Sequence, residues 1–331
     1  MSDTASFLGS VPLLAGIADG DLAELAALLR PRVLGAGDVI WREGERADVM
    51  HIVVDGNVAV SLSLPGDSET EVANVGPGEV LGEIALLDGG RRSGTARATE
   101  PTRVLLLGRS DFAALVSRRH PTAFALKRRF ADVACQRLRT QLARLAASLG
   151  DGDGAGGEPL EHPRAELEPS GAPDSRYVRR LADFRAVEPL ALWGFLTAGR
   201  YMRCAAGRTL IAEGEPATAC YVTMNGAVER VIVRRGRRIR VGLAGPGRAF
   251  GHESLIDGAP SPVTETTRER ALLLVVPRDA FEPLYHGETA GSHVFLDVIL
   301  RDLMASLRQA LRPQAHLASR RAWAADPPAP T

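Results

Sequence analysis

Aromatic side chains, lysines and cysteines are all scarce in this sequence. Aromatic residues make up 5% of the 331 residues, whereas hydrophobic residues as a whole make up 45%. The cores must therefore be built mainly from leucine, valine and alanine. Lys127 is the single lysine, so nearly all basic residues are arginines, a bias that indicates a GC-rich bacterial genome.

Three further absences exclude whole classes of protein. Cys135, Cys204 and Cys220 are odd in number and far apart, which argues against a disulfide framework and a cysteine-rich zinc site. The N-terminal residues lack the basic start of a signal peptide, and no apolar run approaches the roughly 20 residues that span a bilayer. We therefore expect a soluble cytoplasmic protein without a membrane partner.

Neither sign of charge dominates, and the histidines do not cluster. The chain has 40 basic and 40 acidic residues, which argues against a globally basic nucleic-acid-binding protein. A cupin-like enzyme would need closely spaced histidines and a carboxylate to hold its metal. The seven histidines are scattered: His51, His120, His162, His252, His286, His293 and His316. We therefore predict no metal site, no cofactor and no enzymatic activity, and keep a cupin-like enzyme only as a lesser alternative.

The sequence contains an internal repeat. The stretch "VIWREGERADVMHIVVDGNVAV" faces "LIAEGEPATACYVTMNGAVERV", with Gly44 opposite Gly214 at an offset of 170. Further on, "VGPGEVLGE" faces "AGPGRAFGH", with Gly82 opposite Gly251 at an offset of 169. One residue has therefore been lost from a hairpin in the second copy, and the chain carries two copies of one domain.

Each copy begins with a helix, continues with many short strands and ends in helices. "DGDLAELAALL" has leucines at helical spacing, and residues 33–107 contain short apolar runs broken by glycine turns such as "VGPGE". Residues 110–149 show a helical stripe of leucines. This pattern predicts an α+β, mainly β protein with two jelly-roll β-barrels, each flanked by helices.

Composition sets the expected boundaries. A stretch rich in glycine, proline and acidic residues separates the copies, and such a composition is typical of a flexible linker. The predicted parts are an N-terminal tail (1–6), a first domain (7–147), a linker (148–176), a second domain (177–312) and a disordered tail (313–331).

The loop "LGEIALLDGGRRSGTARA", residues 81–98, has the groups needed to hold a ribose phosphate. Gly82 lets backbone approach a ligand closely, and Glu83 can accept a hydrogen bond from a sugar hydroxyl. Arg92 can form a charge-assisted contact with phosphate oxygens, and Ser93 adds a hydroxyl donor. A surface turn with a solvated arginine pair is the alternative interpretation of the same residues.

The same loop resembles the phosphate-binding cassette of the cyclic nucleotide-binding domain family, to which the bacterial catabolite activator and protein kinase A regulatory subunits belong. The resemblance implies that Gly82 and Glu83 meet the ribose, that Arg92 pairs with the cyclic phosphate and that Ser93 donates to it. The ligand would be cAMP or cGMP. In that family the helix after the barrel covers the base, which places Thr140 or Gln141 there, although a solvated helix face explains these two residues equally well.

The second copy lacks the chemistry of the first. At the offset of 169, Glu83 becomes His252, Arg92 becomes Ser261 and Ser93 becomes Pro262. The phosphate would lose its cation, and proline removes a backbone N–H. We therefore expect the second domain to be a degenerate copy, although the neighbouring Glu253 could substitute for His252.

No effector domain is evident, so we expect a bacterial cyclic nucleotide receptor that signals through an unidentified partner protein. A ligand-free scaffold of two barrels is one alternative. Another is a regulator that contacts nucleic acid through the hairpin Arg234–Arg240, which holds five arginines. The amphipathic helices after each barrel would also allow two chains to pair as a homodimer, or would pack on their own barrels.

Overall fold

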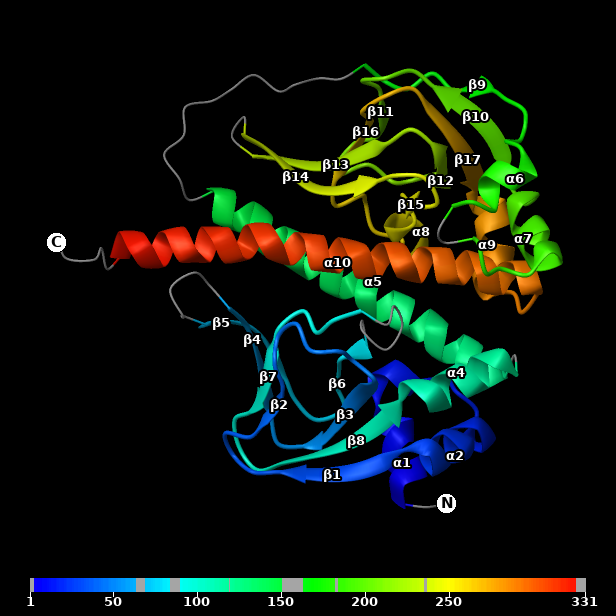
Figure 1. The fold of residues 1–331 in the computed structure, drawn as a ribbon. Coiled ribbons are helices and arrows are strands. Elements are labelled where there is room, and N and C mark those ends of the chain that lie inside the picture. Colours follow the sequence, from blue (N-terminus) through cyan, green and yellow to red (C-terminus); the bar gives the residue numbers. More distant parts are fainter. Residues whose placement is uncertain are drawn as a thin grey trace. The chain divides into compact units, whose positions relative to one another are not determined.

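The short apolar runs fold into antiparallel strands joined by glycine turns, as predicted. The structure is a computed structural model, and it describes residues 3–63, 69–83, 90–118, 120–150, 163–181, 184–234 and 237–325. Two compact units can be separated, residues 1–130 with 314–331 and residues 131–313. Both units combine helices with two sheets (Figure 1), so the predicted mainly β, α+β fold class is confirmed.

The first unit contains a barrel of two four-stranded sheets. One sheet has the order β1 (Arg30–Leu34), β8 (Thr102–Gly108), β3 (Val49–Asp55), β6 (Val80–Leu81). The other has the order β2 (Val39–Trp41), β7 (Thr95–Ala98), β4 (Val58–Ser63), β5 (Glu69–Val75). Helical elements precede and follow the strands: α1 (Asp3–Ser10), η1 (Pro12–Leu14), α2 (Asp19–Leu28), α4 (Arg109–Ser117) and the start of α5 (Pro121–Gly150).

The second unit repeats this strand order. One sheet runs β15 (Ala249–Phe250), β12 (Ala219–Asn225), β17 (Ala271–Pro277), β10 (Arg200–Cys204), with β9 (Glu168–Pro169) added at its edge. The other runs β11 (Thr209–Ile211), β16 (Thr264–Thr267), β13 (Val228–Arg234), β14 (Arg237–Ala244). Its helices are α6 (Ser175–Val178), α7 (Pro189–Leu196), α8 (Glu253–Asp257) and α9 (Arg278–His286), together with the second part of α5 and the part of α10 (Ala290–Ala325) up to residue 313.

The strand registers confirm where the repeat loses one residue. In the first barrel Val58 pairs with Val75, whereas in the second barrel the equivalent Val228 pairs with Ala244. At the offset of 170 the partner of Val228 would instead be Gly245, so the deletion lies within the hairpin β13–β14. The change of offset from 170 to 169 thus marks a shorter hairpin between otherwise equivalent strands.

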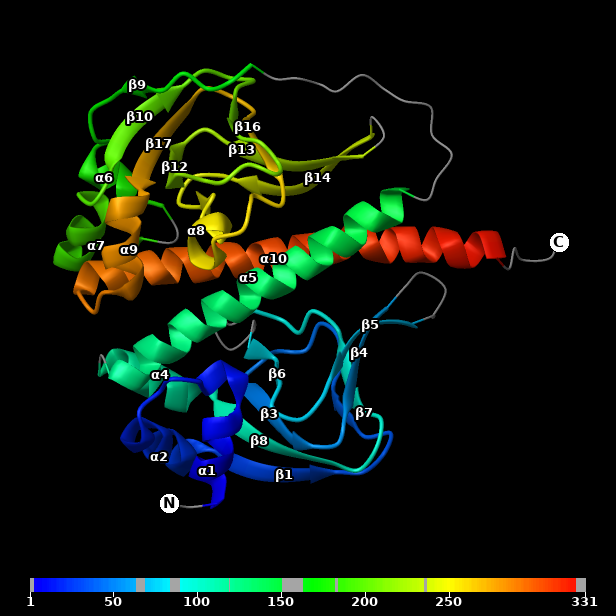
Figure 2. The same cartoon turned by 180° about the vertical axis from the view of Figure 1, so that it is seen from behind.

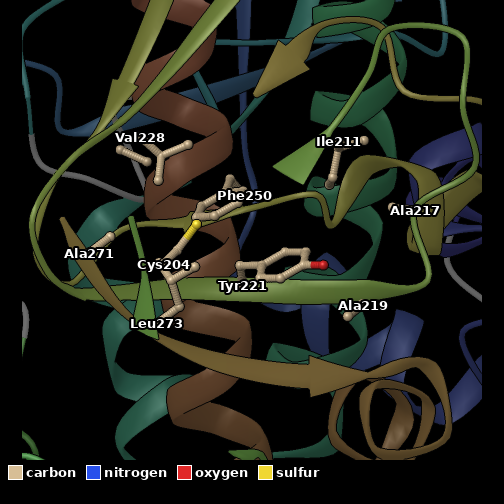
Figure 3. Packing of buried hydrophobic residues seen from close by; sticks show 10 residues of the cluster. Cys204, Ile211, Ala217, Ala219, Tyr221, Val228, Phe250, Ala271 and Leu273 are labelled. Atoms are coloured by element: carbon tan, nitrogen blue, oxygen red, sulfur yellow. The ribbon is translucent and has the colours of Figure 1, made fainter. Parts of the chain in front are cut away.

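Apolar side chains fill the second barrel, and Figure 3 shows how they lie. The rings of Tyr221 and Phe250 are stacked, with centroids 5.0 Å apart and planes 7° from parallel. Ile211, from β11, is 4% exposed and belongs to the same cluster. With few aromatic residues in the chain, the remaining space is filled by small side chains: Cys204, Ala217, Ala219, Val228, Ala244, Ala271 and Leu273.

Three predicted boundaries differ from the structure. Helix α1 begins inside the predicted tail 1–6, because Ala5 and Leu8 are buried. The predicted linker 148–176 is wrong for its second part, since Ser170 N donates to Tyr201 O at 2.8 Å and β9 pairs with β10. The predicted tail 313–331 is helical as far as Ala325. Residues 151–162 of the predicted linker and 326–331 of the predicted tail lie outside the described residues.

The end of the first domain, predicted at residue 147, also differs from the division of the structure. Residues 131–150, the second part of α5, belong to the second unit. Arg139 forms a two-point ion pair with Asp257 and donates to Pro260 O at 2.6 Å. These bonds tie the second part of α5 to α8 within the second unit; Figure 2 labels both helices.

Candidate functional site

The predicted binding loop begins where strand β6 ends. Leu81 pairs with His51 of β3, and the next residue, Gly82, has a φ of +82° that L side chains rarely adopt. A Cβ added to Gly82 would collide with Nη1 of Arg92. Glycine is thus required at position 82 for two reasons: the backbone has a positive φ, and any side chain would clash with the guanidinium of Arg92. The apolar turn of the loop, residues 84–89, lies outside the described residues.

Arg92 lies inside the first unit, not in solvent. The residue is 7% exposed, and its Nη2 donates to Val49 O at 2.7 Å while Nη1 reaches Gly82 O at 3.4 Å. The guanidinium carbon lies 3.8 Å from the ring centroid of Trp41, within the range of a cation–π contact. The alternative of a solvated arginine pair is therefore wrong for Arg92, the residue that the prediction assigned to the phosphate.

The charge of this guanidinium is only partly compensated. Burial lowers the pKa of Arg92 to about 10, against the opposing pull of Glu83, Asp48 and Glu45, so the group is still protonated at neutral pH. Its Nε is buried without a hydrogen-bond partner. Within the described ranges no carboxylate forms an ion pair with Arg92. A buried cation with a spare donor has the charge and the hydrogen-bonding capacity to bind an anion.

Trp41 and His51 complete the surroundings of Arg92, and the sequence analysis did not identify either. The Trp41 indole donates to Gly94 O at 2.9 Å, which holds its ring under the guanidinium. The His51 ring lies 5.1 Å from that of Trp41. Burial, together with the charges of Arg92 and Arg32, lowers the pKa of His51 to about 3, so this histidine is neutral under physiological conditions.

The structure places two of the other predicted site residues near Arg92 and two in the second unit. Glu83, the last described residue before the apolar turn, is 2% exposed and close enough to influence the pKa of Arg92. Ser93 is half-buried directly after Arg92. The loop thus brings Gly82, Glu83, Arg92 and Ser93 into one region. Thr140 and Gln141 belong instead to the second unit, where the Thr140 hydroxyl donates to Gln136 O of its own helix. Their contact with a base stays a prediction.

The second repeat keeps the backbone of this loop but not its side chains. In the first repeat Arg92 N donates to Glu45 O and its carbonyl accepts from Gly44 N. In the second, Ser261 makes the same two bonds with Glu215 and Gly214, at 2.7 and 2.9 Å. The frame that carries Arg92 is therefore preserved around a residue that has no charge.

In the second repeat a hydrocarbon side chain, not a guanidinium, lies closest to the glycine of the loop. A Cβ added to Gly82 would meet Arg92, whereas one added to Gly251 would lie 2.6 Å from Cδ1 of Ile211. Ile211 stands where the first repeat has Trp41, at the offset of 170. The second pocket thus lacks the cation, and the side chain of Ile211 lies against the glycine of its loop, as expected of a degenerate copy.

A buried polar cluster lies next to Gly251, and the scattered positions of the histidines in the sequence did not predict it. Arg230, 4% exposed, bonds to Asp302 of α10 at 2.8 Å and to Glu265 of β16 at 3.2 Å. His252 and Glu253 are buried beside them. Burial raises the pKa of Glu265 to about 8 despite the nearby Arg230. Sequence reasoning missed the cluster because its members come from four separate elements.

The predicted basic hairpin is partly neutralised. Arg234 pairs with Glu213, and Arg238 pairs with Glu229 at 2.5 Å. Arg235, at the tip, lies outside the described residues. The part of the hairpin that the structure describes therefore does not present a row of unpaired arginines to a phosphate backbone.

Comparisons with known proteins agree with the sequence repeat. The family model described as cyclic nucleotide-binding domain matches residues 31–119 and again residues 201–287. Both matches begin and end close to the barrels, so together they account for each copy of the repeat. Among the described helices, none has a stretch of sufficient length and hydropathy to cross a membrane.

The two curated relatives described here are of different kinds, and each matches the chain over about one domain, whereas a solved structure matches most of it. The cyclic AMP receptor protein of Thermus thermophilus is 34% identical over 37% of this chain and 58% of its own length. A cyclic nucleotide-gated potassium channel of Mesorhizobium japonicum is 37% identical over 33% of this chain and 29% of its own length. The cAMP-bound regulatory domain of Toxoplasma gondii PKA covers 86% of this chain and 92% of that one, with 18% identity and a TM-score of 0.33. The chain spans less than two thirds of the length of these two curated relatives.

Proposed function

Because this chain belongs to the cyclic nucleotide-binding domain family, we propose that its first barrel binds cAMP or cGMP and that its second barrel does not. The observation that carries the proposal is Arg92, a buried and protonated guanidinium with a spare Nε and no carboxylate ion pair in the described ranges. A cyclic phosphate would supply the anion that this site lacks.

Binding exchanges weak acceptors for a strong one. Arg92 now donates to two neutral carbonyl oxygens, those of Val49 and Gly82. Hydrogen bonds to a charged acceptor are worth roughly twice as much as bonds to a neutral one, so the exchange favours the phosphate. Trp41 keeps the guanidinium plane in place, and Glu83, an acceptor only, suits the ribose hydroxyl.

The experiment is a calorimetric titration of the full-length protein with cAMP and with cGMP. We expect one site per chain, weakened at least tenfold by Arg92→Ala, since a charged hydrogen bond contributes about 1.5–3 kcal/mol. Ser261→Ala, the equivalent position of the second repeat, is the matched control and should leave both stoichiometry and affinity unchanged. Two sites would refute the assignment of the second barrel, and no heat with either nucleotide would refute the proposal.

We extend the proposal to a cytoplasmic bacterial receptor that is not itself an enzyme and that signals through a partner protein. Support comes from the relatives, which include a receptor protein, a gated channel and a kinase regulatory subunit. Affinity capture from the source organism, with and without nucleotide, tests this. A protein retained in only one of the two states, and no longer switched by nucleotide in Arg92→Ala, is the expected result.

A further inference from the structure

The second unit contains three metal-ligating side chains that converge inside the protein. One donor atom each from His252, Glu253 and Asp302 lies within 4.8 Å of the other two, and all three residues are buried. His252 and Glu253 follow Gly251 at the start of α8, and Asp302 reaches them from α10. His252 stands at the position that corresponds to Glu83 of the first repeat.

The histidine of this group is the unusual member. His252 is 0% exposed, and neither Nδ1 nor Nε2 has a hydrogen-bond partner. Its nitrogens lie 3.9 Å from Glu253 Oε2 and 3.8 Å from Asp302 Oδ2, too far for hydrogen bonds. A buried imidazole without partners costs free energy, so its retention between two carboxylates needs an explanation.

The charges of the cluster leave room for a cation. Arg230 is the one guanidinium that bonds to it among the described residues, and it faces three carboxylates, those of Glu253, Glu265 and Asp302. Glu265 is neutral at pH 7 because its pKa is raised to about 8, so the carboxylates of Glu253 and Asp302 carry one more negative charge than Arg230 balances. Arg230 also bonds to Ser306 Oγ and Ala249 O, so it is fixed at the side of the site and would orient Asp302 from outside the coordination sphere.

We propose that His252, Glu253 and Asp302 bind a divalent first-row transition-metal ion, with Zn²⁺ as the best match. One imidazole and two carboxylates suit such an ion better than Ca²⁺ or Mg²⁺, which prefer oxygen ligands alone. Donor atoms around a tetrahedral zinc ion lie about 3.4 Å apart, so adjustments of about 1 Å would close the site. The fourth position would be taken by water or by Glu265, whose Oε2 also lacks a partner. The second barrel would then hold a metal where the first holds a nucleotide.

Cobalt is the probe, because Co²⁺ replaces Zn²⁺ and absorbs visible light. The full-length protein is stripped with a chelator, loaded with Co²⁺, desalted and examined for visible absorption and metal content. We expect one Co²⁺ per chain and an increased melting temperature. His252→Gln and Asp302→Asn should each lower the retained cobalt at least tenfold, since even residues outside the coordination sphere change affinity by about 10–100-fold.

His286→Gln is the matched control, because His286 is exposed and paired with Glu282 of its own helix. It should bind cobalt as the wild type does. Wild-type protein without stoichiometric metal would overturn the proposal whatever the variants do. Retention of the metal in both site variants would overturn it equally. Neither measurement involves a nucleotide, so this result is independent of the test of Arg92.

Discussion

His51 should make the first unit sensitive to acid. The residue is 3% exposed, and burial beside Arg92 lowers its pKa from 6.5 to about 3. In the unfolded chain the same histidine binds a proton near pH 6.5. Between these two values only the unfolded state is protonated, so the free energy of unfolding falls as the pH falls.

The size of the effect follows from the shift. One pKa unit corresponds to about 1.4 kcal/mol, so lowering the pH from 6.5 to 5 should cost the wild type about 2 kcal/mol through His51. Carboxylates titrate in the same range, and a comparison with His51→Gln removes their contribution. The glutamine variant should be less stable at pH 7.5, because Trp41 loses its ring contact. On acidification, however, the variant should lose less stability than the wild type, by about 2 kcal/mol.

Urea unfolding of both proteins at pH 7.5 and pH 5 measures this difference, and His120→Gln serves as a control. His120 is half-buried and paired with Glu24, so its removal should not reduce the loss in acid. An NMR titration of the His51 ring should show no protonation above pH 5. A ring that titrates near pH 6.5, or equal losses in wild type and His51→Gln, would refute the argument.

Three further predictions concern stability and binding, and calorimetry and urea unfolding measure them. Gly82→Ala should lower the free energy of unfolding by about 1–2 kcal/mol, since it forces a left-handed φ on alanine and displaces Arg92. Nucleotide affinity should fall as well, and unchanged affinity would contradict the close approach of Gly82 to Arg92. Arg139→Ala should destabilise the second unit by about 1–2 kcal/mol, because its pair with Asp257 is about one-fifth exposed; an unchanged unfolding midpoint would contradict this. Arg230→Ala leaves buried carboxylates unpaired and should therefore cost about 3–5 kcal/mol. A loss below about 1 kcal/mol would contradict this.

The repeat and the binding loop could be predicted because they depend on local pattern. Glycines at Gly82 and Gly251 punctuate the sequence at a fixed spacing, and both have a positive φ in the structure. The order of Gly82, Glu83 and Arg92 is contained in one short stretch, so the loop could be interpreted without knowing how the chain folds around it.

Contacts between distant segments could not be predicted in this way. Trp41 and Arg92 are far apart in the sequence, and nothing in the composition of β2 indicates that its indole supports a guanidinium. The partners of Arg230 come from β16, α8 and α10, so the cluster exists only once those elements are packed. The regular structure of residues 163–176 could not be predicted from the sequence either, because backbone groups make their hydrogen bonds to β10 and β11.

The filling of the second pocket also makes its loss hard to reverse. The backbone that would carry an arginine at Ser261 is intact, so a single substitution could restore the charge. That new guanidinium would meet Ile211 at Gly251, and Ile211 stands where the first repeat has the supporting indole of Trp41. An arginine at position 261 would therefore fit only if Ile211 were also replaced. Duplication thus left two barrels that can now diverge independently, with one free to change its interior while the other is held to its ligand.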